Sequence, residues 1–207
     1  QARGARGAAR FEGAVHGGEI GKGIDPAGSE RCRTDCVEAF GLATVREIDA
    51  GGATRADSVL KGLSRLSAAI DTVLVHDGAR PLFPPGLLAA GISDYQDGDC
   101  DGAVFGLPVT DTIKEVVAGE RLVARTPDRE LFWAAQTPQI FARAFLEKAY
   151  KAPPEVLAAA TDDASLVERA GGRVKMTPGS TENIKITTPI DIVVAEEVLR
   201  RREHPTA

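Results

Sequence analysis

The sequence has no excess of basic residues, few cysteines and no long apolar run. Its 207 residues include 25 Lys and Arg against 30 Asp and Glu, which gives a net charge of -5. A general nucleic-acid coat needs a basic surface to neutralise phosphates, so this balance excludes that class. It still allows a local basic pocket for one small phosphorylated ligand. No apolar stretch approaches the length of a membrane span and no signal peptide is visible, so we expect no membrane partner.

The cysteines argue against a disulfide scaffold and against a zinc site. There are only three, and an odd number does not build a disulfide scaffold. Cys32 and Cys36 are spaced as C-x3-C, but His16 and His76 are distant in sequence, which argues against zinc and leaves the role of the pair open. Cys100 is expected to be a small packed residue. This usage favours a reduced, cytoplasmic protein.

The first 40 residues lack the texture of a folded segment. Eight glycines fall within the first 28 positions, and no run of apolar β-formers or sustained helical period occurs among them. Such composition is typical of flexible chain. We therefore divide the sequence into an atypical segment, residues 1–40, and a domain, residues 41–207.

Strand-like and helix-like runs alternate through that domain. Alternation at this spacing predicts an α/β sheet, mostly parallel, with helices on both faces. A glycine between two short apolar runs predicts a hairpin at 112–134. The predicted strands are 45–48, 72–76, 103–107, 173–176 and a short one around Lys185, and the predicted helices are 56–70, 84–96, 140–150, 163–170 and 189–202.

Two clusters at predicted strand ends and turns carry polar side chains. His76–Pro81 follows a strand directly, where Asp77 is placed to hold a divalent cation and Arg80 to pair with phosphate. The same residues also read as an Asp-Gly turn with a surface ion pair. Gly51–Ser58 opens a helix whose backbone N–H groups suit an anion or a nucleotide, and it equally reads as a capped loop. Local pattern leaves both alternatives open.

Further polar clusters have ordinary explanations when each is taken alone. Pro108–Lys114 follows a strand, Gln136–Gln139 precedes a helix, and Thr161–Ser165 opens one. Helix capping and turn chemistry account for all three. Lys185 lies between two isoleucines, where it would simply face solvent on an edge strand.

Taken together and in order, the motifs are much more specific. The set GGATRADSV, VHDGARP, PVTDTIK, TPDRELFWAAQTPQ, TDDASLVE and ENIKITTPID resembles the 2-C-methyl-D-erythritol 4-phosphate cytidylyltransferase family, over about Gly51 to Glu197. The resemblance implies a Rossmann-like nucleotidyltransferase sheet with a projecting β-arm, at about 112–134, used in homodimerisation. It also implies transfer of a cytidylyl group from CTP to the polyol phosphate with Mg²⁺, in the non-mevalonate route to isoprenoid precursors.

The resemblance carries roles onto matching positions of this sequence. Lys185 matches the lysine that stabilises the transition state, and Asp77 matches the acid beside the ribose and the metal. The family often has an acid where this chain has Ala53, so one nucleotide contact is expected to be absent. The implied nucleotide-binding residues are Gly52, Ala53, Arg55, Ser58 and Asp77, and the implied substrate-binding residues are Arg80, Thr112, Arg129 and Thr161.

The amino end departs from the family pattern. Members open with an apolar strand and a Gly-rich phosphate loop that supplies a catalytic arginine and lysine, whereas this sequence predicts no opening strand. Arg10 echoes the arginine and is the candidate for this catalytic residue. Lys22, the only lysine before Lys61, is the candidate for the catalytic lysine, although it does not fall at the matching spacing. We therefore expect weak CTP binding and slow turnover. Two alternatives stay open: a related cytidylyltransferase acting on ribitol phosphate, and an inactive dimeric binding protein that lacks the phosphate loop.

Overall fold

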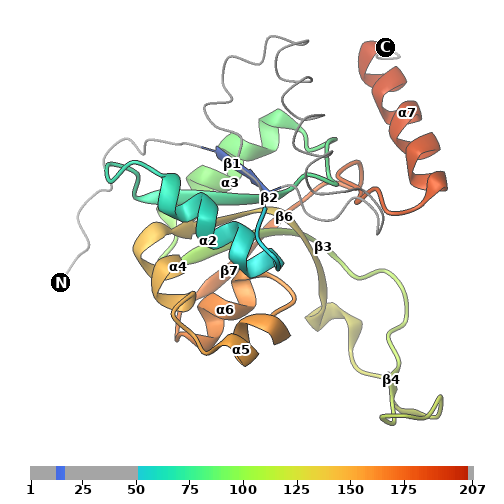
Figure 1. Ribbon diagram of the computed structural model, residues 1–207. Coiled ribbons are helices and arrows are strands. Elements are labelled where there is room, and N and C mark those ends of the chain that lie inside the picture. Colours follow the sequence, from blue (N-terminus) through green and yellow to red (C-terminus); the bar gives the residue numbers. More distant parts are fainter. Residues whose placement is uncertain (1–12, 17–50, 205–207) are drawn as a thin grey trace.

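The computed structural model of the chain describes residues 13–16 and 51–204, with 13–16 described as backbone only (Figure 1). Arg10, Lys22, Cys32 and Cys36 therefore lie outside the described residues, as does the strand predicted at 45–48. Among the described helices, none combines the length and the apolar character that a membrane crossing requires.

One five-stranded sheet forms the centre of the fold. Its strand order is β1 (Gly13–His16), β2 (Thr72–Asp77), β6 (Trp133–Ala142), β3 (Gly102–Pro108) and β7 (Val174–Pro178). β1 pairs parallel with β2 and β3 pairs parallel with β7, whereas β6 runs antiparallel to both of its neighbours. The α/β class is confirmed: four of the described strands share one direction, and the sheet is mixed.

Three expectations about strands are wrong. A strand does open the described chain, because residues 13–16 pair with Leu74–Asp77 of β2 although they contain only one strong β-former, Val15. The sequence pattern does not predict β6, because Gln136–Gln139 places a proline and three polar residues inside a central strand, where apolar alternation is expected. The segment around Lys185 forms no strand; its link to the neighbouring turn is a bond from the Ile186 N–H to the Ala79 carbonyl.

Helices cover both faces of the sheet, as predicted (Figure 1). On one face, α2 (Arg55–Arg65), α4 (Arg143–Ala149) and α6 (Asp163–Arg169) pack against inward side chains of β2, β3 and β6, including Val73, Val104 and Phe141. On the other face, α3 (Pro85–Asp97) packs against Phe105 and Ile140. Successive strand residues point to opposite faces, so each strand contributes to both cores.

Local sequence signals set the helix ends. Thr54 caps α2 through a reciprocal pair of bonds with Asp57, and α2 ends at Arg65, earlier than the predicted residue 70. Gly171, with φ +85°, ends α6 as expected. Thr188 and Asp191 cap α7 (Pro189–Glu203), also as expected. A short helix that the sequence did not suggest, α5 (Pro154–Ala159), joins α4 to α6.

The predicted hairpin is present and projects away from the sheet (Figure 1). Its strands are β4 (Glu115–Val116) and β5 (Val123–Arg125), with Gly119 at φ +80° in the turn between them. A 3-10 turn, η1 (Arg129–Leu131), then leads into β6. We call residues 112–132 the arm; the last two residues of the predicted hairpin belong to β6 instead.

Candidate active site

One edge of the sheet gathers the polar side chains that the sequence motifs contribute. β2, β3 and β7 end at this edge and the antiparallel β6 begins there, as the pairings of Val75 with Gln139 and of Gly106 with Ala135 require. In open α/β sheets, ligands bind beyond the carboxyl ends of the strands. We call this region, with the loops that follow β2 and β7, the site edge.

Asp77, Arg80 and Lys185 meet at the site edge. Asp77 ends β2, and its Oδ2 lies 3.3 Å from Lys185 Nζ and 3.9 Å from Arg80 Nε. The Asp77 side chain is only 16% exposed, whereas that of Lys185 is 50% exposed. The lysine therefore keeps N–H groups directed to solvent and available to an anionic ligand. Lys185 is half-exposed, as the alternative explanation expected, but it lies on a loop and not on an edge strand.

The Arg80 guanidinium is held by a backbone carbonyl, and its Nε–H donor is left without a partner in the described part of the chain. Its Nη1 donates to the Asn183 carbonyl at 2.7 Å, and its Nε is buried with no hydrogen-bond partner among the described residues. Burial lowers the pKa of Arg80, and the charge of Asp77 opposes that effect. A buried N–H without a hydrogen-bond partner costs free energy. A ligand oxygen placed here would accept the hydrogen bond that the described residues do not supply.

The Gly51–Ser58 turn approaches the same edge from α2. The Gly52 N–H donates to Ser58 Oγ at 2.8 Å, which folds the turn back over the helix start. A Cβ on Gly52 would lie 2.1 Å from the Asp57 Cβ, so this position tolerates only glycine. Ala53 is exposed at the turn and offers no polar side-chain atom.

Arg55 is anchored by an acid that the motif reading took for part of a helix cap. Its guanidinium donates to both carboxylate oxygens of Asp163, at 2.9 and 2.6 Å. Asp163 is fully buried and also accepts a hydrogen bond from the Tyr150 hydroxyl. Burial lowers the pKa of Arg55, but the bond and charge of Asp163 more than offset this, so the net pKa is raised. Asp162, the neighbouring acid, does cap α6.

The remaining predicted substrate residues are not all joined to this cluster. Thr161 is exposed in the loop that precedes Asp163. Thr112 and Arg129 lie on the exposed arm, where Arg129 Nη1 donates to the Thr110 carbonyl at 2.7 Å. Within residues 51–204, neither arm residue forms a hydrogen bond or ion pair with Asp77, Arg80 or Lys185.

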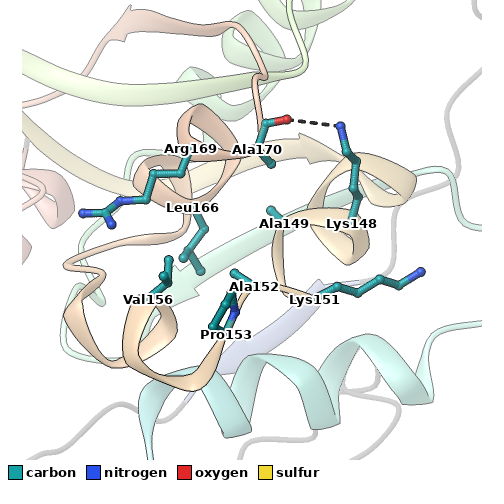
Figure 2. A pocket seen from close by; sticks show the side chains of 9 residues that line it. All are labelled: Lys148, Ala149, Lys151, Ala152, Pro153, Val156, Leu166, Arg169 and Ala170. Atoms are coloured by element: carbon teal, nitrogen blue, oxygen red, sulfur yellow. Dashed lines mark hydrogen bonds between the residues drawn. The ribbon is translucent and has the colours of Figure 1, made fainter.

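A hollow of the described surface lies elsewhere. Figure 2 shows a cavity of about 420 Å³ between α4, α5 and α6, with an apolar floor of Ala149, Val156 and Leu166. Lys148 at its rim donates to the Ala170 carbonyl. None of the predicted site residues within 51–204 lines it, so the site edge is defined by convergent polar groups rather than by depth.

The donor set at the site edge bears on the expected Mg²⁺. Residues 51–204 hold no cluster of three or more His, Cys, Asp or Glu side chains suited to a metal. Magnesium in nucleotide enzymes is commonly held by one or two carboxylates together with substrate phosphates and water. Asp77 supplies one such carboxylate, so the residues present fit a metal that arrives with the nucleotide.

Comparison with known proteins decides the family. The family model described as 2-C-methyl-D-erythritol 4-phosphate cytidylyltransferase matches residues 30–201. The chain belongs to this family. The match spans more of the sequence than the six motifs do, and it confirms the resemblance on which the site assignments are based.

Individual relatives agree with the family model. A protein of Syntrophotalea carbinolica with the family's name is 47% identical over 81% of this chain and 71% of its own length. One of Alkaliphilus metalliredigens, with the same name, is 42% identical over 84% of this chain and 71% of its own. The crystal structure of the cytidylyltransferase from Thermus thermophilus superposes with a TM-score of 0.63 at 38% identity, covering 73% of this chain and 72% of that one.

Proposed function

We propose that this member of the cytidylyltransferase family transfers a cytidylyl group from CTP to 2-C-methyl-D-erythritol 4-phosphate in isoprenoid precursor synthesis. An oxygen of the substrate phosphate attacks the α-phosphorus of CTP, and the bond from that phosphorus to the β-phosphate oxygen breaks. The products are 4-diphosphocytidyl-2-C-methyl-D-erythritol and pyrophosphate. Family membership and the names of the close relatives support this reaction.

The observation that carries the proposal is the meeting of Lys185, Arg80 and Asp77 at one edge of the sheet. Both reactants are anions, so the main task of the protein is to bring them together and to stabilise the charge that builds up between them. Lys185 is half-exposed and offers free N–H groups, and the Nε of Arg80 has no partner among the described residues. These two cations suit the phosphates of the two substrates.

Three other residues act on the nucleotide in this proposal. Gly52 and Ser58 shape the turn that receives the cytosine, with backbone N–H groups at the start of α2 beside it. Two donors of Arg55 are used on Asp163, so we assign Arg55 to fixing that turn, with its remaining donors available to the nucleotide. Ala53 leaves base recognition to backbone groups.

Asp77 would hold the Mg²⁺ that accompanies CTP. When bound, the metal neutralises phosphate charge and orients the triphosphate. The Asp77 carboxylate already contacts two cations, Lys185 and Arg80, so all three charges share a small volume. Occupancy by a metal would redistribute these contacts and leave Lys185 to the phosphates.

We further propose a homodimer in which the arm of one protomer completes the site of its partner. The arm exposes Val116, Leu122, Val123 and Leu131, and Leu131 is 80% exposed. A two-stranded hairpin is marginal in water unless it packs against another surface. In this arrangement Thr112 and Arg129 of one protomer reach the polyol phosphate in the partner's site. Thr161 is contributed by the protomer that holds that site, and it lies near the same phosphate. The cytoplasmic location stays a prediction from the sequence.

Turnover after substitution of Lys185 tests the proposal. We expect Lys185→Ala to fold normally, because the side chain is half-exposed, and to lose about 10² to 10³ in kcat. Lys151→Ala, at an exposed lysine between α4 and α5, is the matched control and should keep its rate. Retention of more than about half the rate by Lys185→Ala would contradict the role assigned to this lysine.

The alternatives have their own tests. Paired assays with methylerythritol phosphate and ribitol phosphate distinguish the two polyols, and the relatives' names favour the first. An inactive binding protein would form a folded dimer yet bind no CTP in calorimetry. The expectation of weak CTP binding concerns residues that lie largely outside the described chain, so the same titration measures it directly.

A further inference from the structure

Gln136, Thr137 and Gln139 at the start of β6 are polar and almost completely buried. Their exposed fractions are 7%, 6% and 1%. Their sequence explanation, turn chemistry before a helix, does not apply to a central strand. Burying polar groups costs free energy unless each is hydrogen-bonded, so the destinations of their bonds are informative.

Thr137 is bonded to the turn that presents Asp77 and Arg80. Its Oγ1 accepts from the Asp77 N–H at 2.9 Å and lies 2.9 Å from His76 Nδ1. His76 Nε2 lies 3.0 Å from the Arg80 carbonyl, which can only accept, so Nε2 carries the proton. In the neutral ring Nδ1 is then the acceptor, and the Thr137 hydroxyl donates to it. The hydroxyl therefore contacts the start of the turn directly, and it reaches the Arg80 carbonyl through the His76 ring.

Gln136 is bonded to the loop that carries Lys185. Its Nε2 donates to the Ser180 carbonyl at 2.9 Å, and its Oε1 accepts from Ser180 N–H and from Asn183 Nδ2, at 3.3 and 3.2 Å. Asn183 is fully buried and also donates to the Thr137 carbonyl at 2.8 Å. Because the Asn183 carbonyl accepts from Arg80, this amide cluster locates the lysine loop and one cation together.

Gln139 is bonded to the loop that opens α6. Its Nε2 donates to Asp162 Oδ2 at 2.8 Å, and its Oε1 accepts from the Ala164 N–H at 3.1 Å. These bonds lie on either side of Asp163, the acid that anchors Arg55. The same strand thus holds the start of α6 in place. Through Asp163 and Arg55, it also holds the nucleotide turn.

We propose that Gln136, Thr137 and Gln139 are positioning residues, through which one strand sets three separate parts of the site. Thr137 sets the Asp77–Arg80 turn, Gln136 sets the Lys185 loop, and Gln139 sets Asp163 and so Arg55. The inference rests on the proposed function of the site edge. None of the three needs to touch a substrate, because each acts through the residue that it holds.

Thr137 offers the sharpest test, since valine is nearly isosteric and serine keeps the hydroxyl. We expect Thr137→Val to lower kcat/KM by about 10- to 100-fold, because small misplacement of reacting groups is costly, and Thr137→Ser to stay within about threefold of the wild type. Thr72→Val, at a buried threonine where β2 begins, is the control that leaves kinetics unchanged. Equal kinetics for the two valine variants would overturn the proposal.

The two glutamines separate positioning from a general loss of stability. We expect Gln136→Met to lower kcat through the Lys185 loop, and Gln139→Met to raise the KM for CTP through Arg55. A merely structural role would move both parameters alike, in proportion to the loss in melting temperature, and that result would count against the proposal.

Crystal structures supply a readout that does not depend on turnover. In Thr137→Val the separation of Asp77 Oδ2 and Lys185 Nζ should exceed about 4 Å, beyond ion-pair distance, while Thr137→Ser keeps it near the present 3.3 Å. An unchanged separation in the valine variant contradicts positioning even if the enzyme proves inactive. Absence of turnover in the unaltered chain would instead refute the proposed function.

Discussion

At the site edge, polar side chains are buried and bonded to one another, whereas on the arm apolar side chains are exposed. Asp163, Asn183 and Gln139 are essentially inaccessible to solvent, and each has hydrogen bonds within the chain. Leu131 and Leu122, on the arm, are 80% and 65% exposed. In our proposal, one protomer organises the nucleotide side of the site, and the arm packs against a second protomer.

Substitution of Asp163 is the strongest way to break the site edge. Asp163→Ala removes the acceptor of both Arg55 and Tyr150, and we expect it to cost about 3 kcal/mol of unfolding free energy. Burial and the nearby Asp163 charge raise the pKa of Tyr150, so this hydroxyl stays neutral and donating. Urea denaturation monitored by circular dichroism measures the loss.

An exposed ion pair provides the control for Asp163. Asp99 bonds Arg173 at 2.6 Å, but both side chains are more than two-thirds exposed. Asp99→Ala should therefore cost less than about 0.5 kcal/mol. Similar losses for the two alanine variants would show that the buried cluster contributes no more than a surface pair.

Introducing a charge on the arm tests the other half of the comparison. We expect Leu131→Asp to raise the dimer dissociation constant at least about tenfold, because a charged side chain at this position cannot pack against the apolar surface of the partner. The melting temperature of each protomer should be unchanged. Analytical ultracentrifugation across a concentration series measures the constant. Leu60→Asp, at an exposed leucine of α2, should leave it unaltered; a monomeric wild type at micromolar concentration would refute the dimer itself.

Paired arginines give the smallest expected effects and sharpen the contrast. Arg125 bonds Glu115 across the hairpin, with both side chains more than half exposed, and Arg125→Ala should cost about 0.5 kcal/mol or less. Arg143 is less exposed and bonds both Glu147 and the Ser67 carbonyl, so Arg143→Ala should cost about 1–2 kcal/mol. Thermal melts measure the loss of stability in each variant. An equal loss in the two, or a larger loss for Arg125→Ala, would contradict this expectation.

Regular periodicity explains which parts of the fold could be predicted. The helix at 189–202, the strand at 72–76 and the hairpin turn at Gly119 each follow from capping, β-branched or glycine signals, and the structure confirms all three. β6 could not be predicted because its polar residues are hydrogen-bonded to partners that are far away in sequence. Gln136, for example, bonds Ser180 and Asn183.

The candidate site shows the same limit. Asp77, Arg80 and Lys185 were named from motifs, and the structure brings them together. That Asp163 would anchor Arg55, 108 positions away, has no signature in local sequence, since an acid at the start of a helix usually serves the helix itself. Its partner Tyr150 looked like an ordinary residue at the end of a helix. Such roles depend on tertiary contacts alone.

Complementation between inactive protomers tests most directly whether two chains share each site. Arg129→Ala and Lys185→Ala each remove one side of the proposed composite site, one on the arm and one at the site edge. In a random mixture half of the dimers are mixed, and each mixed dimer holds one intact site of two, so we predict recovery of about a quarter of wild-type kcat. If the mixture shows no more activity than the mean of the two variants assayed alone, the arm does not complete the partner's site.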